Sequence, residues 1–183
     1  MNKKVRFLMI LFITGVGLGI LSSTVYASPF GEGIYGANVP YGGSTSLAIS
    51  TSGNIAASIS SPASGGTLSS SLGTVTVTSS DVVGYSLYAR ALGSTNMASG
   101  TSTIPTSSNS VAGALSVNTW GFNTDGSTNF IGMSLADSLI HSLVGPATAG
   151  DTTSITYGVK VDNAKQSGNY QVSILYTAVP QTN

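Results

Sequence analysis

The sequence of 183 residues contains no cysteine and very little charge. Neither a disulfide nor a thiolate metal site can form, so the stability of the fold has to come from packing. Charged residues make up only 7% of the chain, and His141 is the one histidine. The nearest acidic residue in sequence that could orient it is Asp137, which is a weak basis for a hydrolytic site. We therefore predict no enzymatic activity.

The first 27 residues have the three parts of a secretory signal peptide. Three basic residues lie among the first six, an uncharged apolar run follows from Phe7 to Ile20, and Val25-Tyr26-Ala27 gives the small-x-small pattern of a cleavage site. We therefore predict that residues 1–27 are removed and that the mature chain begins at Ser28, outside the cytoplasm. Retention of the run as an anchor is the alternative, but the run is short and glycine-rich for a spanning helix. After cleavage we expect no membrane span.

The predicted mature chain is weakly acidic and rich in hydroxyl groups. Three basic residues remain against six acidic ones, which gives a net charge of −3 with the histidine neutral. This balance argues against nucleic acid and anionic lipids as partners. Serine and threonine make up 48 of the 156 mature residues, a composition common in extracellular bacterial β-proteins.

Ser28 to Gly43 forms a segment of its own, rich in glycine and aromatic residues. It has neither strand nor helix periodicity and contains two prolines, so we predict a flexible, extended N-terminal arm ahead of one domain over 44–183. Such an arm can add a strand to a neighbouring molecule, with its apolar side chains filling pockets, and a plain spacer is the alternative. The residues that we expect to make this contact are Phe30, Ile34, Tyr35, Val39 and Tyr41.

From residue 45 onward, apolar and polar residues alternate in short runs separated by serine, glycine and proline turns. The alternation predicts eight or nine strands, most clearly at 151–161 and 168–178. The other predicted strands are 45–51, 55–59, 74–78, 83–90, 115–122 and 130–133, with a loop over 60–71. Residues 93–110 form either a mobile excursion or a loop with one short edge strand near 103–104. This pattern predicts an all-β, two-sheet antiparallel sandwich, with a closed barrel as the alternative.

One segment shows helical spacing instead. Leucines recur every four residues from Leu135 to Leu143, Ser134 can cap the first turn, and Gly145-Pro146 can end the last one. We therefore predict one short helix over 134–144, which would place Asp137 and His141 on the same helical face.

Patterns for metal and cofactor sites are weak. Asp125, Asp151 and Asp162 each lie beside a predicted turn, where a carboxylate bonds local backbone, and calcium-loop spacing is missing. The glycines of residues 31–36 match a dinucleotide-binding pattern, but no predicted strand precedes them and no helix follows. We therefore expect no metal and no cofactor.

Aromatic residues suggest a second function. Trp120 is the only tryptophan, and Tyr88 falls on the face of its strand opposite the apolar one, so the two could stack on a neutral sugar. Trp120 is either a core residue beyond a bulge or an exposed contact. The alternative function is therefore a secreted, non-catalytic module that binds carbohydrate or protein.

Short segments near the predicted strands resemble known proteins. Gly168-Asn169-Tyr170-Gln171-Val172 resembles the segment that opens a late strand of immunoglobulin-like domains, where the tyrosine makes a corner contact, although the cysteine pair of those domains is missing here. The segments that resemble secreted surface proteins of small-genome bacteria are 31–36, 83–87, 119–122, 155–159 and 168–178. This resemblance implies an immunoglobulin-like sandwich at the cell surface, with a pilus-like or coat-like assembly as one form of it.

Export, an all-β domain and an N-terminal arm together predict a secreted cell-surface protein with a structural or adhesive role. We expect its partners to be further copies of itself, other surface proteins or glycans, and we expect the arm to supply the contact by strand addition.

Overall fold

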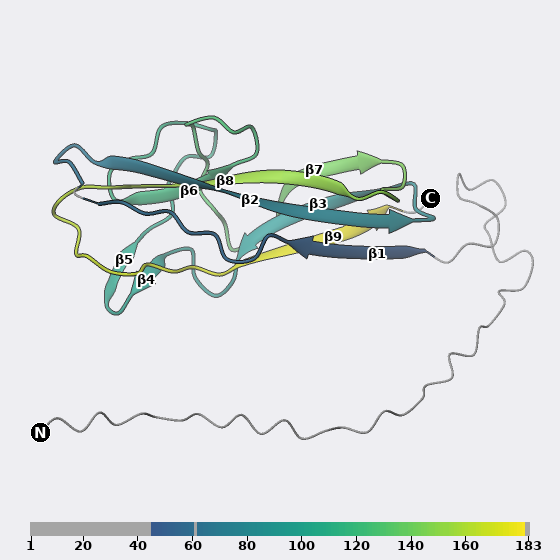
Figure 1. The fold of residues 1–183 in the computed structure, drawn as a ribbon, viewed down its shortest axis with the longest axis horizontal. Coiled ribbons are helices and arrows are strands. Elements are labelled where there is room, and N and C mark those ends of the chain that lie inside the picture. The colour runs from purple at the N-terminus through teal and green to yellow at the C-terminus, as the bar shows by residue number, and fades with distance from the viewer. Residues whose placement is uncertain (1–44, 61, 182–183) are drawn as a thin grey trace, which may run out of the picture.

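The computed structural model describes residues 45–60 and 62–181, and all the regular secondary structure in them is β-strand. The predicted signal peptide, 1–27, and the predicted arm, 28–43, lie outside the described residues, as do the arm residues Phe30, Ile34, Tyr35, Val39 and Tyr41. The strands are β1 (Ser46–Thr51), β2 (Thr67–Ser80), β3 (Gly84–Ala91), β4 (Met97–Ser99), β5 (Ser102–Ile104), β6 (Thr119–Asn123), β7 (Ser138–Val144), β8 (Asp151–Val161) and β9 (Ile174–Gln181) (Figure 1).

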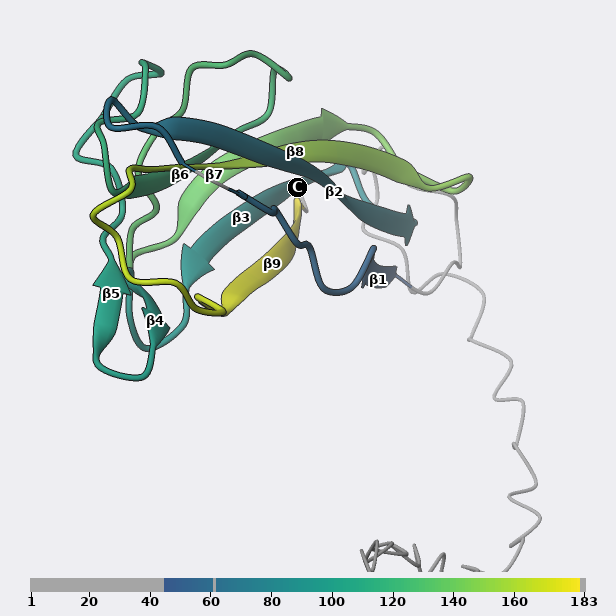
Figure 2. The ribbon, with the colours of Figure 1, turned by 60° about the vertical axis from the view of Figure 1, so that its left-hand side comes forward.

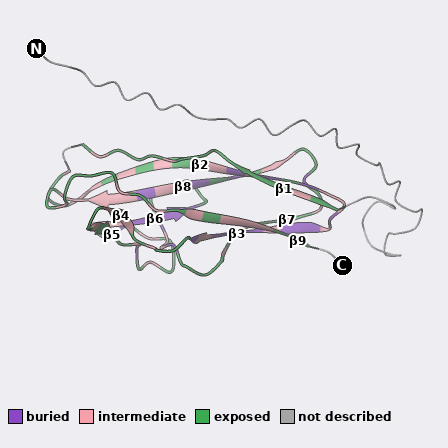
Figure 3. Ribbon diagram, turned by 90° about the horizontal axis from the view of Figure 1, so that it is seen from below, coloured by how far each residue is buried: buried purple, intermediate pink, exposed green. Residues whose placement is uncertain are grey.

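The strands form two larger sheets and a small hairpin, and every strand pair is antiparallel. The first sheet has the order β1-β2-β8-β6, the second has the order β7-β3-β9, and β4 pairs with β5. Seen from below, β2 and β8 lie in one layer, and β3, β7 and β9 lie in the other (Figure 3). The predicted all-β class with antiparallel sheets is confirmed.

The hydrophobic core lies between the two sheets. On β3 the alternation of the sequence holds, because Tyr85, Leu87 and Ala89 are 0–1% exposed and point toward the first sheet, where Val75 and Val77 of β2 are fully buried. Alternate residues of a strand point to opposite faces, so one face of each strand faces the core and the other faces outward. Full burial of a side chain of this size contributes about 1.5–3 kcal/mol.

The prediction of a helix over 134–144 is wrong, because residues 138–144 form β7, antiparallel to β3. The register shifts by one residue: Leu87 of β3 is opposite His141, but Tyr88 is opposite Leu139, so Ile140 is an extra residue in a β-bulge. A bulge changes the side-chain alternation. Ile140 and Leu143 therefore both pack against the core at a spacing of three, which an uninterrupted strand does not allow and a helix does.

The strand predicted at 55–59 is also wrong. Residues 52–60 contain no strand, and β1 pairs with β2 instead, from Ser46 opposite Ser80 to Thr51 opposite Val75. β2 itself begins at Thr67, inside the predicted loop 60–71, because β8 pairs with it from Thr67 to Val77. The strand predicted from 168 begins only at Ile174.

The outer edge of β6 is covered by two non-strand segments. Trp120 exchanges backbone hydrogen bonds with Pro105 and Ser107, and Phe122 exchanges them with Ile131. The predicted strand 130–133 is thus reduced to isolated bridges. The β4-β5 hairpin occupies part of residues 93–110, so that segment holds two short strands, not one.

Candidate functional site

One side of the molecule is bounded by two strand edges that have no further partner among the described residues. β1 ends the first sheet, β9 ends the second, and the two strands contact each other. On the opposite side, β6 is covered as described above, whereas β7 also ends its sheet without a further partner in the described chain. We call the side bounded by β1 and β9 the open side. Unpaired edges of this kind expose backbone donors and acceptors to a partner strand.

Core-facing residues on the open side are less buried than their neighbours one strand further in. Ile49 of β1 lies directly opposite Val77, so both point to the same face of the sheet, yet Ile49 is 41% exposed and Val77 is fully buried. On β9, Tyr176 is only half-buried, whereas Ala89 opposite it on β3 is 1% exposed. The core is therefore not closed between β1 and β9.

A groove of about 690 Å³ continues the open side beyond the end of β1. Its walls are residues 51–57, from the last residue of β1 onward, and residues 169–174, up to the first residue of β9. Figure 2 shows the dark blue chain after β1 and the yellow chain that enters β9 as two separate segments. The volume falls within the range of about 300–1,000 Å³ typical of ligand sites. None of the side chains that line the groove is charged, so it suits a neutral ligand.

The first wall leaves the sheet through a short, well-defined turn. The Ser52 amide donates to the Thr74 carbonyl at 2.9 Å, and the Ser52 hydroxyl accepts the Thr74 amide at 3.0 Å. Gly53 then takes a φ of +83°, which favours glycine. Beyond it, Ile55 packs over Gly73, where a Cβ would lie 2.1 Å from the Ile55 Cδ1 atom. No backbone hydrogen bond joins residues 54–59 to another described residue, so this wall is an unpaired edge.

The floor of the groove is built from aromatic residues of both sheets. Trp120 is 2% exposed, and its Nε1 donates to the Thr95 carbonyl at 2.9 Å. The hydroxyls of Tyr157 and Tyr176 share a hydrogen bond that joins β8 to β9. Burial raises the pKa of both tyrosines, so both stay neutral at physiological pH. A neutral aromatic floor can hold apolar and aromatic side chains.

The structure separates the two aromatic residues proposed for sugar stacking. Trp120 lies on the core face of the first sheet, and its burial favours the core role over that of an exposed contact. Tyr88 is half-buried on β3, one residue along from the core-facing Leu87 and Ala89, so it points to the outer face of the second sheet. The two side chains are therefore not brought together into one platform.

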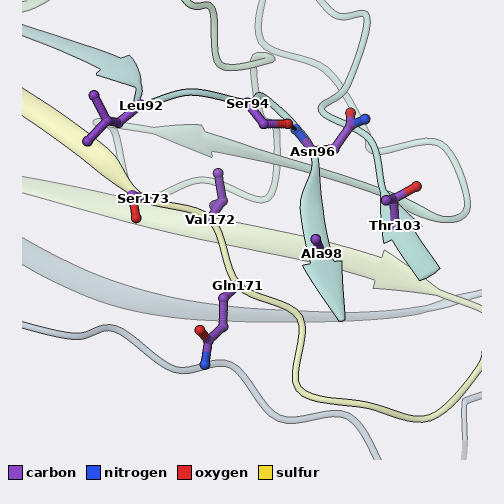
Figure 4. A pocket seen from close by; sticks show the side chains of 8 residues that line it. All are labelled: Leu92, Ser94, Asn96, Ala98, Thr103, Gln171, Val172 and Ser173. Carbon is purple, nitrogen blue, oxygen red and sulfur yellow. Dashed lines mark hydrogen bonds between the residues drawn. The ribbon is translucent and has the colours of Figure 1, made fainter. Parts of the chain in front are cut away.

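A smaller pocket of about 280 Å³ lies between the β4-β5 hairpin and the chain before β9. Figure 4 shows Ser94 and Asn96 above it, Ala98 and Thr103 on the two short strands, and Val172 on the far wall. Its lining is neutral, like that of the groove, and the two share Gln171 to Ser173. This segment is held by the backbone pair between Gln171 and Ala98.

A cluster of titratable residues links the two sheets away from the groove. The Tyr85 hydroxyl donates to Asp151 Oδ2 at 2.7 Å, and His141 Nε2 lies 2.8 Å from the same oxygen. The hydrogen bond from Tyr85, with a further one from His141, holds the pKa of Asp151 below its usual value, and burial raises the pKa of Tyr85. Asp137, expected beside His141, instead pairs with Arg90 at 3.3 Å. The cluster fastens β8 of one sheet to β3 and β7 of the other.

Of the three aspartates expected to bond local backbone at turns, two do so. Asp125 Oδ1 accepts the Ser127 amide at 3.0 Å, and Asp162 Oδ1 accepts the Ala164 amide at 3.2 Å. Asp151 differs from both, because it bonds the side chains of Tyr85 and His141 and no local backbone amide. Within residues 45–60 and 62–181, no group of three histidine or acidic side chains lies close enough to hold a metal ion.

No protein-family model matches this chain, and neither a curated protein nor a solved structure is significantly similar to it. Among the described residues, no helix is long and apolar enough to cross a membrane.

Proposed function

We propose that this chain is a secreted, non-catalytic cell-surface protein with a structural or adhesive role, and that it associates with further copies of itself by strand addition. The observation that carries the proposal is the open side, where the outer edges of β1 and β9 have no partner strand among the described residues and the core is partly uncovered. Export rests on the sequence of residues 1–27, which has the features of a cleavable signal peptide.

We also propose that the domain is an immunoglobulin-like sandwich. The antiparallel sheets of four and three strands have the right layering for it. A second support is Tyr170, whose hydroxyl donates to the Gln166 carbonyl at 2.8 Å, four residues upstream. A tyrosine that bonds upstream backbone before a late strand is typical of the tyrosine corner in such domains.

Strand addition fits both the chemistry of the open side and the sequence of the predicted arm. An added strand forms main-chain hydrogen bonds with an unpaired edge, and its alternate side chains enter the space beside the core. Residues 28–43 supply apolar and aromatic side chains for such a contact, and five of them, Phe30, Ile34, Tyr35, Val39 and Tyr41, are the ones that we propose to take part.

The experiment that tests this function is a measurement of assembly by light scattering and negative-stain microscopy. The mature chain from Ser28 is compared with a variant in which Ile34 and Tyr35 are both replaced by aspartate. We expect filaments or defined oligomers from the former and a monomer from the latter, because two carboxylates would have to enter an uncharged site. A mature chain that remains monomeric at all accessible concentrations would contradict the proposal.

A further inference from the structure

We infer that the groove beyond the end of β1 is the site that receives residues 28–43 of a second copy of this chain. This inference rests on the proposed function, since it names the receiving surface for the strand addition proposed above. It is carried by the groove, which the described residues form without that segment.

The charges of the groove and of the segment match. No lining side chain of the groove is charged, and residues 28–43 contain a single charged residue, Glu32. The groove presents the half-buried rings of Tyr157 and Tyr176, which lie with the buried Trp120 in its floor, and the segment brings two tyrosines and a phenylalanine. Aromatic pairs of this kind contribute about 0.5–1.5 kcal/mol each beyond the area that they bury.

The walls of the groove also offer backbone groups to an extended peptide. Residues 54–59 form no backbone hydrogen bond with the other described residues, and the outer edge of β9 has no strand partner among them. On the second wall, the backbone amide and carbonyl of Gln171 both bond Ala98, and the Ser173 carbonyl accepts the Leu92 amide. These three backbone groups already have partners. An extended chain laid between the walls would bond the groups that remain.

The length and position of residues 28–43 favour insertion into the groove of a neighbouring molecule over insertion into the groove of their own molecule. Residues 28–43 span about 50 Å when extended at about 3.3 Å per residue, enough to run along both the groove and β1. Within one molecule the segment joins the domain at Thr45, ahead of β1, whereas the groove lies past Thr51 at the other end of that strand. The segment of the same chain would have to reverse its direction to enter, and that of a second copy would not.

The absence of cysteine allows a direct test by cross-linking. One mature variant carries Ala37→Cys in the arm, and it is mixed with a second variant carrying Ala56→Cys on the exposed first wall of the groove. The matched control carries Val144→Cys on β7, the other free edge, where the side chain is 91% exposed. A short bis-maleimide joins the thiols, and light scattering of each mixture reports assembly independently.

We expect the Ala37→Cys and Ala56→Cys proteins to cross-link on the order of a hundredfold faster than the control pair at micromolar protein, because docking raises the effective thiol concentration to the millimolar range. Faster linking to Val144→Cys, with assembly intact, would overturn the inference but leave the proposed function standing. A chain carrying both Ala37→Cys and Ala56→Cys that links only within itself would show that each molecule fills its own groove. If the chain without cysteine substitutions shows no assembly by light scattering, the proposed function itself is refuted.

Discussion

Replacement of Gly158 by alanine should destabilise the domain, because an aromatic ring lies where the new methyl group would be. Gly158 of β8 is paired with Gly121 of β6, and together they leave a flat outer patch on the first sheet. A Cβ at Gly158 would lie 2.5 Å from Cζ of Phe130, a ring that is 1% exposed. The backbone of Phe130 is fixed by two hydrogen bonds to Gly113, of 2.8 and 3.2 Å. The ring therefore has little freedom to yield.

Overpacking of this kind costs about 1–3 kcal/mol. For a domain of this size, about 2 kcal/mol corresponds to a loss of roughly 4–8 °C in Tm. The free energy of unfolding is best measured by urea denaturation, where the midpoint should fall while the slope stays the same. Gly65→Ala is the control, because Gly65 has open space around its Cβ position and no left-handed φ, and it should change stability by less than about 0.5 kcal/mol.

A double variant separates steric overlap from a general effect on the strand. Phe130→Leu alone should destabilise by leaving a cavity over the glycine pair, but Gly158→Ala added to it should cost much less than it costs alone. Equal cost of Gly158→Ala in both backgrounds, or a Gly158→Ala protein as stable as the parent, would refute the placement of the ring.

Three further changes test other parts of the structure. Tyr85→Phe should lower the free energy of unfolding by about 1–2 kcal/mol at pH 7. Because the pKa of Asp151 in the folded protein lies below its unfolded value, the stabilisation from the bond with Tyr85 is present above about pH 4 and is lost as the pH falls through the folded pKa. The urea midpoints of the parent and of the Tyr85→Phe protein should therefore converge in acid. Trp120→Ala should cost about 3–5 kcal/mol, and the fluorescence of the single tryptophan in the parent protein should be blue-shifted and poorly quenched by acrylamide, whereas strong quenching would place it at the surface. Tyr170→Phe removes the hydroxyl that bonds Gln166 and Ser102 and should lower the free energy of unfolding by about 0.5–1.5 kcal/mol, with no change expected if the corner contact does not form.

The sequence predicted strands well where one face alternates without interruption. The prediction for β3 and β8 was correct within one residue at each end, because apolar residues keep a period of two along β3 and from Ile155 to Val161 of β8. The prediction failed where the alternation depends on a distant partner. The bulge at Ile140 gives β7 a helical spacing, and the serine-rich start of β2 becomes a strand only because β8 lies beside it.

The candidate site could not be predicted because its parts are far apart in the chain. The groove combines residues near 55 with residues near 171, and its floor includes Trp120. Local pattern assigned the first of these to a strand and left the role of Trp120 open, since burial depends on packing between sheets. The link from Asp151 to Tyr85 and His141 likewise joins three strands, and no spacing in the sequence indicates it.

The most direct test of the account is hydrogen exchange of the backbone amides on the open side, measured by mass spectrometry on the mature chain over a range of protein concentrations. Residues 54–59 and the free edge of β9 should be protected increasingly as concentration rises, while the β7 edge exchanges at the same rate throughout. Fast exchange of residues 54–59 at every concentration, or protection that does not depend on concentration, would contradict the claim that a second copy docks there.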